Sequence, residues 1–587
     1  MEQDKQVRIA KLQPDLHEQE QITEPKYPLL DASEVWDGQT DLKNELAVDV
    51  RERLREEEVL IDISPAKLRL PSRKVSSLEI LMKAAHASSP DEIGNNGPTV
   101  ASVSFFEDNS DSRYQRQHGR DDLYAAMDVC DIPFTELTSL EEYADPVVRD
   151  YLSHVSGETY PKLLETVVLS LAASQGMREE AFVEEANIEE GLPYGFEKPG
   201  SIILVNFEDG DPLGRKFMNR KGWRPRFYAS ADAPGLFIDA IASLYAKDNN
   251  FFLKHAYEAI DGNTYSINHA FDLTVRWLTS NMDHNPAGLV YYSNPYRDGR
   301  GMRNQGWKDS AEAMVHKDGN WADSNAGVAP IEMQAQAVIS LRKAAAIYRQ
   351  AYSSANELAD DLERRADKLL KFILNDGWIE DESGGYFAMG WDRVVEGGIR
   401  RIETRSVDMH YMLRVLDMGD PYQKEMVHQT VQSLTSRDML TRWGNRVMSR
   451  SEAAYGDYRY HCGVWPDKSN RVAESMAACG FYGLDKYLGR LTSNLIDRLG
   501  FIPEHIAGVD SAEPAIPKND LYVYNRKYSE LYLVEQIPPL WQTWGASSEL
   551  GKIYRHLTTP QEADADEDRQ FEKKIIEDIA GRYSTRA

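Results

Sequence analysis

The chain has 587 residues, of which 42% are hydrophobic and 10% aromatic, enough for a large folded core and too apolar for a disordered protein. Its net charge of −28, from 67 basic and 95 acidic side chains, disfavours binding to nucleic acid or to an anionic membrane surface. The three cysteines lack metal-ligand spacing, and neither a signal peptide nor an apolar run of membrane-spanning length is visible. We therefore expect a soluble, cytoplasmic protein.

The sequence pattern divides the chain into three parts. Residues 1–70 are polar and charged and predict an N-terminal extension, whereas 71–556 carry repeated helical periodicity and predict one catalytic-size domain. Residues 557–587 begin with an acidic run and continue as a polar helix. Four apolar residues of this last helix are expected to dock onto the body: Phe571, Ile575, Ile576 and Ile579.

Helical periodicity is clearest at 160–175, where Leu163, Val167 and Leu171 follow one another at four-residue spacing. Similar patterns recur at 235–247, 330–352, 356–374, 404–417, 422–434, 468–482, 485–498 and 536–554. Long loops rich in Gly, Asn, Asp and aromatic residues separate them, and only 201–207 reads as a strand, as in a small hairpin. Many helices with long loops and little strand predict an all-α domain.

Two carboxyl groups lie on such loops, at positions where catalytic side chains are often found. Asp309 follows Asn304-Gln305-Gly306-Trp307-Lys308, and Glu504 ends Gly500-Phe501-Ile502-Pro503. Glycoside hydrolysis needs one carboxyl that gives a proton and a second that stays ionised, so the pair fits that chemistry. Other acids on loops are as easily explained as helix caps or salt-bridge partners: Asp121, Glu189, Glu190, Asp232, Asp318 and Asp467.

Residues 304–319 resemble the signature of amylo-α-1,6-glucosidases, the glucosidase domains of glycogen debranching enzymes. Further landmarks follow that family's order over roughly 100–550: Gly119-Arg120-Asp121-Asp122, residues 171–176 followed by Asn187-Ile188-Glu189-Glu190-Gly191, residues 227–237, Pro330-Ile331-Glu332-Met333-Gln334, Gly463-Val464-Trp465-Pro466-Asp467, Ile502-Pro503-Glu504 and residues 536–541. The resemblance implies an (α/α)6 toroid with small β-hairpin insertions, in which loops at one end of the ring form the site.

The resemblance also implies an inverting reaction with Asp309 as general acid and Glu504 as general base, for which Glu535 and Glu513 are substitutes. It favours Arg120, Asp121 and Asp232 as residues that hold sugar hydroxyls, against the alternative of helix caps. Further candidates for substrate binding are Glu190, Trp307, Lys308, His316 and Trp465, each with a structural alternative: core packing for the Trp and His side chains and solvent exposure for Glu190. We expect Lys308 to point toward a sugar hydroxyl or another acid, away from Asp309.

The expected function is therefore an inverting glycoside hydrolase that releases glucose from an α-linked glucoside or oligosaccharide, without a cofactor or metal ion. Two departures from the family, at His118 and at His505-Ile506-Ala507, put glycogen itself in doubt as the substrate. The alternatives are a catalytically silent sugar-binding toroid and another (α/α)6 carbohydrate enzyme, such as a phosphorylase or an epimerase. The sequence predicts a carbohydrate partner and leaves the oligomeric state open.

Overall fold

A computed structural model describes residues 117–132, 163–177, 197–206, 226–294, 302–310, 312–352, 354–395, 398–456, 459–499, 502–508, 510, 519–525, 530–536, 543–559 and 566–584. The predicted extension 1–70 lies outside these ranges, as do Glu190 and Glu513, so the domain boundaries at 71 and 556 stay predictions.

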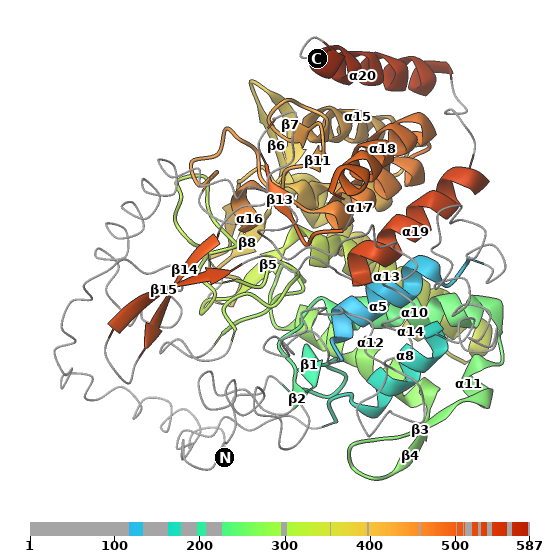
Figure 1. Cartoon of the computed structure of the whole chain (residues 1–587). Helices are drawn as coiled ribbons and strands as arrows, with labels where there is room; N and C mark the ends of the chain where they lie inside the picture. The colour runs from blue at the N-terminus through green and yellow to red at the C-terminus, as the bar shows by residue number, and fades with distance from the viewer. Residues whose placement is uncertain are drawn as a thin grey trace, which may run out of the picture.

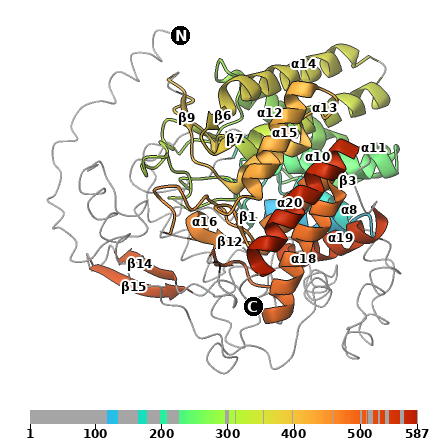
Figure 2. The ribbon, with the colours of Figure 1, turned by 90° about the horizontal axis from the view of Figure 1, so that it is seen from above.

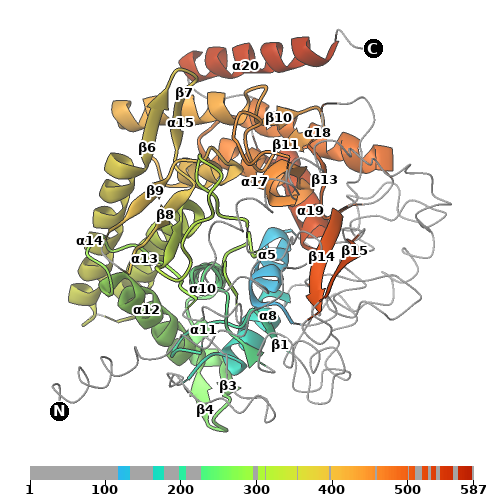
Figure 3. The ribbon, with the colours of Figure 1, turned by 90° about the vertical axis from the view of Figure 1, so that its left-hand side faces the viewer.

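Six helices form a closed ring in chain order. They are α5 (Gly119–Val129), α10 (Ala233–Lys247), α13 (Ile331–Ala351), the 3-10 helix η5 (Val407–Arg414), α17 (Pro466–Ala478) and α19 (Thr543–Thr558). Each helix packs against the next, and α19 packs against α5, which closes the ring. Figure 3 shows α5, α10, α13, α17 and α19 grouped around the middle of the molecule.

An outer helix follows each inner one along the chain. The outer helices are α8 (Leu163–Ala173), α12 (Ile267–Asp283), α14 (Asn356–Phe372), α15 (Pro421–Leu434), α18 (Tyr482–Leu499) and α20 (Asp566–Ser584). The first five pack on the inner helix that precedes them, whereas α20 packs on α18, and Figure 1 shows it beside α15 and α18. This alternation of inner and outer helices is the predicted (α/α)6 toroid.

Short antiparallel strands lie between the helices of the ring, as predicted. The strand expected within 201–207 is β1 (Val205–Asn206), which pairs with β2 (Arg226–Phe227). The other sheets are β3 (Ala256–Glu258) with β4 (Thr264–Ser266), β5 (Val328–Pro330) with β8 (Gly390–Asp392) and β9 (Arg400–Ile402), β6 (Trp378–Asp381) with β7 (Gly384–Phe387), β10 (Leu440–Thr441) with β11 (Gly444–Asn445), β12 (Gly463–Val464) with β13 (Ile506–Ala507), and β14 (Asn519–Asn525) with β15 (Glu530–Gln536).

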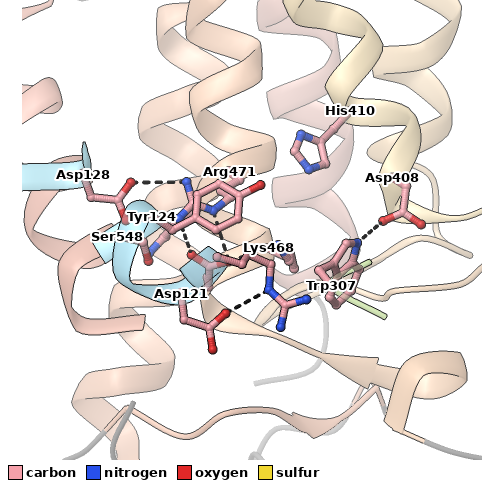
Figure 4. Close-up of polar contacts among 12 residues, drawn as sticks. Asp121, Tyr124, Asp128, Trp307, Asp408, His410, Lys468, Arg471 and Ser548 are labelled. Carbon is pink, nitrogen blue, oxygen red and sulfur yellow. Dashed lines mark hydrogen bonds and ion pairs between the residues drawn. The ribbon is translucent and has the colours of Figure 1, made fainter. Parts of the chain in front are cut away.

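Charged hydrogen bonds, in addition to packing, join the first inner helix to the last two. Asp128, near the end of α5, accepts hydrogen bonds from Arg471 of α17 at 3.2 and 3.1 Å and from Ser547 of α19 at 3.0 Å (Figure 4). Arg471 also pairs with Asp467 one turn earlier on α17, at 3.0 Å. One carboxylate therefore joins the first, fifth and sixth inner helices.

The C-terminal helix α20 lies across the outer layer (Figure 2). Phe571 stacks on His428 of α15 with ring centroids 4.2 Å apart, and Ile575 and Ile579 are buried. The predicted docking of this helix is confirmed for these three residues, and Ile576 is half-buried at the same contact. In the described part of the chain, every helix is too short or too polar to cross a membrane.

Candidate active site

The first turns of five inner helices meet the segment that carries Asp309. Arg120 and Asp121 begin α5, Asp232 precedes α10, Glu332 begins α13, Asp408 begins η5, and Asp467 and Lys468 begin α17. The N-terminus of a helix carries a partial positive charge, which favours carboxylates placed there. Two of these helices start near the expected place because Pro234 and Pro466 occupy their first turns, where the lack of an N–H group costs nothing.

Arg120 is the cation at the centre of this end. Its Nε donates to Asp121 at 2.9 Å, and its Nη1 donates to the Gly306 carbonyl at 2.7 Å and to Asp232 at 3.5 Å. Its Nη2 lies 4.0 Å from Oδ2 of Asp309. The structure thus brings together four residues that were predicted from three separate landmarks: Arg120, Asp121, Asp232 and Asp309.

Asp309 is the most accessible carboxylate of this group, with 30% of its side chain exposed, against 18% for Asp121 and 9% for Asp232. The Tyr460 hydroxyl donates a 2.8 Å hydrogen bond to its Oδ1 and orients the carboxyl group. Asp309 therefore combines a fixed orientation with contact to solvent.

Asp408 holds the two residues that precede Asp309. Its Oδ1 accepts a hydrogen bond from Nε1 of Trp307 at 2.9 Å (Figure 4). Its Oδ2 accepts one from Nζ of Lys308 at 2.6 Å. Lys308 thus points toward another acid, one of the two orientations that we expected. Trp307 and Lys308 are both buried, so any direct contact of theirs with a substrate stays a prediction.

Beneath Trp307 lies a buried group of mixed charge. The Nζ atom of Lys468 is 4.4 Å from the centre of the Trp307 ring and 3.4 Å from Asp467, and burial lowers the pKa of this lysine. Burial also raises the pKa of Glu332 well above its ordinary value, and the neighbouring charge of Asp408 reinforces the rise. The surroundings of Glu332 thus favour its neutral form over its charged form.

A stack of aromatic rings connects Asp309 with the Glu504 loop. Tyr460, which bonds to Asp309, stacks on Trp465 with centroids 5.2 Å apart, and Trp465 stacks on His505 at 5.1 Å. His505 Nδ1 lies 3.9 Å from Oε2 of the buried Glu504. Pairing of β12 with β13 brings these two loops together, since it joins Val464 to Ile506.

Of the remaining predicted residues, His316 and Trp465 are buried among structural partners, and the others lie in β15 or outside the described ranges. His316 hydrogen-bonds to Asp392 at 2.9 Å in a buried pair, so it has a structural partner, and its role toward substrate stays a prediction. Trp465 is only 1% exposed and packs within the ring stack. Glu535 lies in β15, and Glu190 is outside the described residues. The described residues contain no cluster of His, Cys, Asp and Glu that could hold a metal ion.

Sequence reasoning missed four residues of the site: Glu332, Asp408, Tyr460 and Lys468. The available signal was an acidic or basic residue in the first turn of a predicted inner helix, as in Pro330-Ile331-Glu332. Tyr460 carried no such signal, because it lies on the short helix α16 (Arg459–Cys462) within a long loop.

No family model matches the chain, and no curated protein matches it. Among solved structures, the chain is similar to a GH63 mannosylglycerate hydrolase from Thermus thermophilus in complex with Tris, with 13% identity, a TM-score of 0.46, and coverage of 81% of this chain and 99% of that chain. It is also similar to a bacterial glucoamylase complexed with acarbose, with 12% identity, a TM-score of 0.42, and coverage of 92% of this chain and 61% of that chain. These similarities are too distant to assign a reaction to the chain.

Proposed function

We propose that the protein is an inverting glycoside hydrolase that releases glucose from an α-linked glucoside or oligosaccharide. The observation that carries the proposal is the environment of Asp309, a partly exposed carboxyl oriented by Tyr460 and 4.0 Å from Arg120, where the inner helices begin. A buried second carboxyl, Glu504, lies at the other end of the aromatic stack that starts at Tyr460. Two carboxyls in different surroundings are what this chemistry requires.

In the proposed reaction, Asp309 gives its proton to the glycosidic oxygen as the bond from that oxygen to the anomeric carbon breaks. The hydrogen bond from Tyr460 at 2.8 Å holds the carboxyl in one orientation toward the leaving group. Exposure of 30% of the Asp309 side chain allows the acid to regain a proton from water after each turnover. Arg120, with Asp121 and Asp232, would hold the hydroxyls of the sugar ring through charge-assisted hydrogen bonds.

Glu504 is the proposed base, with Glu535 and Glu513 as alternatives. It would take a proton from a water molecule while the oxygen of that water bonds to the anomeric carbon on the face opposite to the leaving group. A proton on His505, 3.9 Å away, would favour the ionised form of Glu504. Inversion requires the two carboxyl groups to stand roughly 6.5–9.5 Å apart, which leaves room for the water.

We infer a neutral glucoside as the substrate, since a net charge of −28 repels anionic polymers. An amylo-α-1,6-glucosidase-like activity follows from the resemblance of residues 304–319 to that family's signature. A smaller glucoside fits the chain as well as a branched polymer does, and a cytoplasmic location would be compatible with either substrate.

Proton NMR of the protein mixed with isomaltose, panose, trehalose, kojibiose or a limit dextrin tests this proposal. Early appearance of β-glucose from one of these substrates is the expected result, and it would identify the linkage. Early α-glucose would mean retention and would remove Glu504 from the role of a water-activating base. Absence of glucose from the whole panel would contradict the proposed hydrolysis of these substrates and favour a silent sugar-binding protein.

A further inference from the structure

One buried carboxylate, that of Asp408, holds the segment that precedes Asp309. Asp408 accepts hydrogen bonds from Nε1 of Trp307 at 2.9 Å, from Nζ of Lys308 at 2.6 Å and from Oγ of Ser406 at 2.9 Å. Asp408 is 2% exposed, and each of its three partners is buried as well. Hydrogen bonds with an ionised acceptor are stronger than neutral ones, and burial removes competition from water.

The same segment is also held by Arg120, which donates to the Gly306 carbonyl at 2.7 Å. Three consecutive residues, Gly306, Trp307 and Lys308, are therefore anchored from α5 and η5, and Asp309 is the next residue. We propose that Asp408 is a positioning residue, which places Asp309 against the glycosidic oxygen by fixing the two side chains before it. This inference rests on the proposed hydrolytic function.

Glu332 lies against Gly306 of the anchored segment. A Cβ atom on Gly306 would stand 2.7 Å from Oε1 of Glu332, so the lack of a side chain at position 306 lets the two groups meet. Glu332 is 6% exposed, and the side chains of Trp307 and Lys308 donate their hydrogen bonds to Asp408 instead. The carboxyl group of Glu332 is therefore close to the segment, and Asp408 is the acid that holds it.

Both acidic and basic side chains lie near Glu332. The acids near Glu332 are Asp408 and Asp232, and the bases near it are Lys468 and Lys308. Tyr124, Tyr292 and Tyr411 also face this group. Burial, together with the charges of Asp408 and Asp232, raises the pKa of Glu332 and disfavours its charged form, and Lys308 donates its 2.6 Å hydrogen bond to Asp408. Asp408 thus remains the anion that holds the segment.

The test compares two substrates that differ in their need for an acid. An alkyl α-glucoside needs a proton on its leaving oxygen, whereas α-glucosyl fluoride loses fluoride without one. In Asp408→Asn, the carboxamide keeps one acceptor oxygen but loses the charge that binds Lys308. We expect kcat on the alkyl glucoside to fall about 10²-fold and kcat on the fluoride to fall less than about threefold, because only the acid is displaced. KM should change little for both substrates.

Ser406→Ala is the second variant, which removes one of the three hydrogen bonds to Asp408 and keeps its charge. In Ser406→Ala, kcat on the alkyl glucoside should again fall more than kcat on the fluoride, but by less than in Asp408→Asn. This variant tests the proposal if Asp408→Asn does not fold. Ser340→Ala is the matched control. Ser340 is buried on α13 and hydrogen-bonds to Gly235 at 2.9 Å, so its loss lowers stability without changing the ratio of the two rates.

Equal losses on both substrates in Asp408→Asn and Ser406→Ala would overturn the positioning role. A second check uses Asp309→Asn: if Asp408 acts through Asp309, the double variant should be no slower on the alkyl glucoside than Asp309→Asn alone. A further loss in the double variant would also overturn it. Failure of the wild-type protein to release glucose from either substrate would instead end the proposed hydrolytic function, and the positioning role with it.

Discussion

At the scale of single residues, replacement of Asp309 should lower turnover while leaving substrate binding nearly unchanged. Asp309→Asn keeps the size of the side chain and removes the transferable proton. We expect kcat on an alkyl glucoside to fall about 10²–10⁴-fold, the usual contribution of general acid–base catalysis, with little change in substrate binding. Steady-state kinetics together with calorimetric titration of the same substrate would measure both quantities.

Asp318→Asn is the control for this prediction, because Asp318 is an exposed acid in the following loop, paired with Arg400 at 3.3 Å. Its turnover should stay at the wild-type level. Unchanged turnover in Asp309→Asn would remove Asp309 from the role of general acid.

Arg120 offers a second prediction at this scale, because its planar guanidinium reaches several acceptors at once. In Arg120→Lys the charge remains, but a single ammonium group cannot reproduce the bonds to Asp121, Asp232 and the Gly306 carbonyl. Loss of charge-assisted hydrogen bonds worth about 1.5–3 kcal/mol should lower kcat/KM by more than tenfold. Initial rates at low substrate concentration would measure this loss, and a value within twofold of wild type would contradict it.

The sequence predicted part of this site and missed the rest for a physical reason. Arg120, Asp232 and Asp309 could be named because each lies in a short motif with its own recognisable pattern. The role of Asp408 depends on a contact with Trp307, 101 residues earlier in the chain, which no local pattern records. The same holds for His316, whose partner Asp392 comes from β8, 76 residues later.

At the scale of helices and strands, Gly119 shows how closely α5 approaches its neighbour. A Cβ atom at this position would lie 2.1 Å from the Ile203 carbonyl and 2.8 Å from Cγ2 of Ile202. Gly119→Ala should therefore shift the start of α5 and move Arg120, the next residue. We expect a loss of roughly 1–3 kcal/mol in unfolding free energy, as for overpacked cores, together with reduced kcat/KM. Urea denaturation and initial rates would measure the two effects.

Gly581→Ala in α20 is the control for that substitution, since a Cβ atom there would have no neighbour within 4 Å. Alanine favours a helix over glycine by about 1 kcal/mol, so this variant should be as stable as wild type or more stable. Equal unfolding free energies and equal kcat/KM values in Gly119→Ala and Gly581→Ala would show that the close contact with Ile203 does not constrain α5.

Helices with a broad apolar stripe could be predicted from their periodicity, whereas α5 could not. Residues 163–173 of α8 and 331–351 of α13 lie within predicted spans. α5 begins Gly-Arg-Asp-Asp, and Arg120 and Asp121 of this turn belong to the site. Its apolar residues therefore begin only after the first turn, which leaves too short a pattern to predict a helix. The span 404–417 became a 3-10 helix over 407–414, where Ser406 caps the first turn through Asp408 N–H. The predicted span 536–554 starts too early, since 530–536 belongs to β15 and α19 begins at 543.

At the scale of the whole molecule, the toroid has polar residues in or next to the first turns of α5, α10, α13, η5 and α17, and apolar residues further along these helices. These apolar residues pack on the outer helices, and the polar first turns gather at the end of the ring where Asp309 lies. The ring closes only when α19 packs on α5, so its first and last helices come from opposite ends of the domain. Interactions that hold α19 in place therefore support the whole ring.

Asp485 of α18 provides such an interaction and a test of ring closure by pH. It is fully buried and accepts hydrogen bonds from Arg555 of α19 at 2.8 and 3.1 Å, with His556 at 3.2 Å. Burial opposes ionisation, but the nearby His556 and the hydrogen bonds from Arg555 outweigh it and lower the pKa of Asp485. A lowered pKa in the folded state contributes stability above the ordinary Asp pKa, and this contribution is lost as pH falls through the lowered value.

Asp485→Asn should therefore be less stable than wild type at pH 7, by roughly 3–5 kcal/mol, the cost of breaking a buried ion pair. The difference should narrow as pH falls below about 4, where the wild-type carboxyl group also loses its charge. Urea denaturation of both proteins at a series of pH values would measure it. Asp566→Asn is the control, because Asp566 pairs with Arg569 on the exposed face of α20, where ion pairs contribute little. A difference between Asp485→Asn and wild type that stays constant across pH would contradict an ionised Asp485 as the link between α18 and α19.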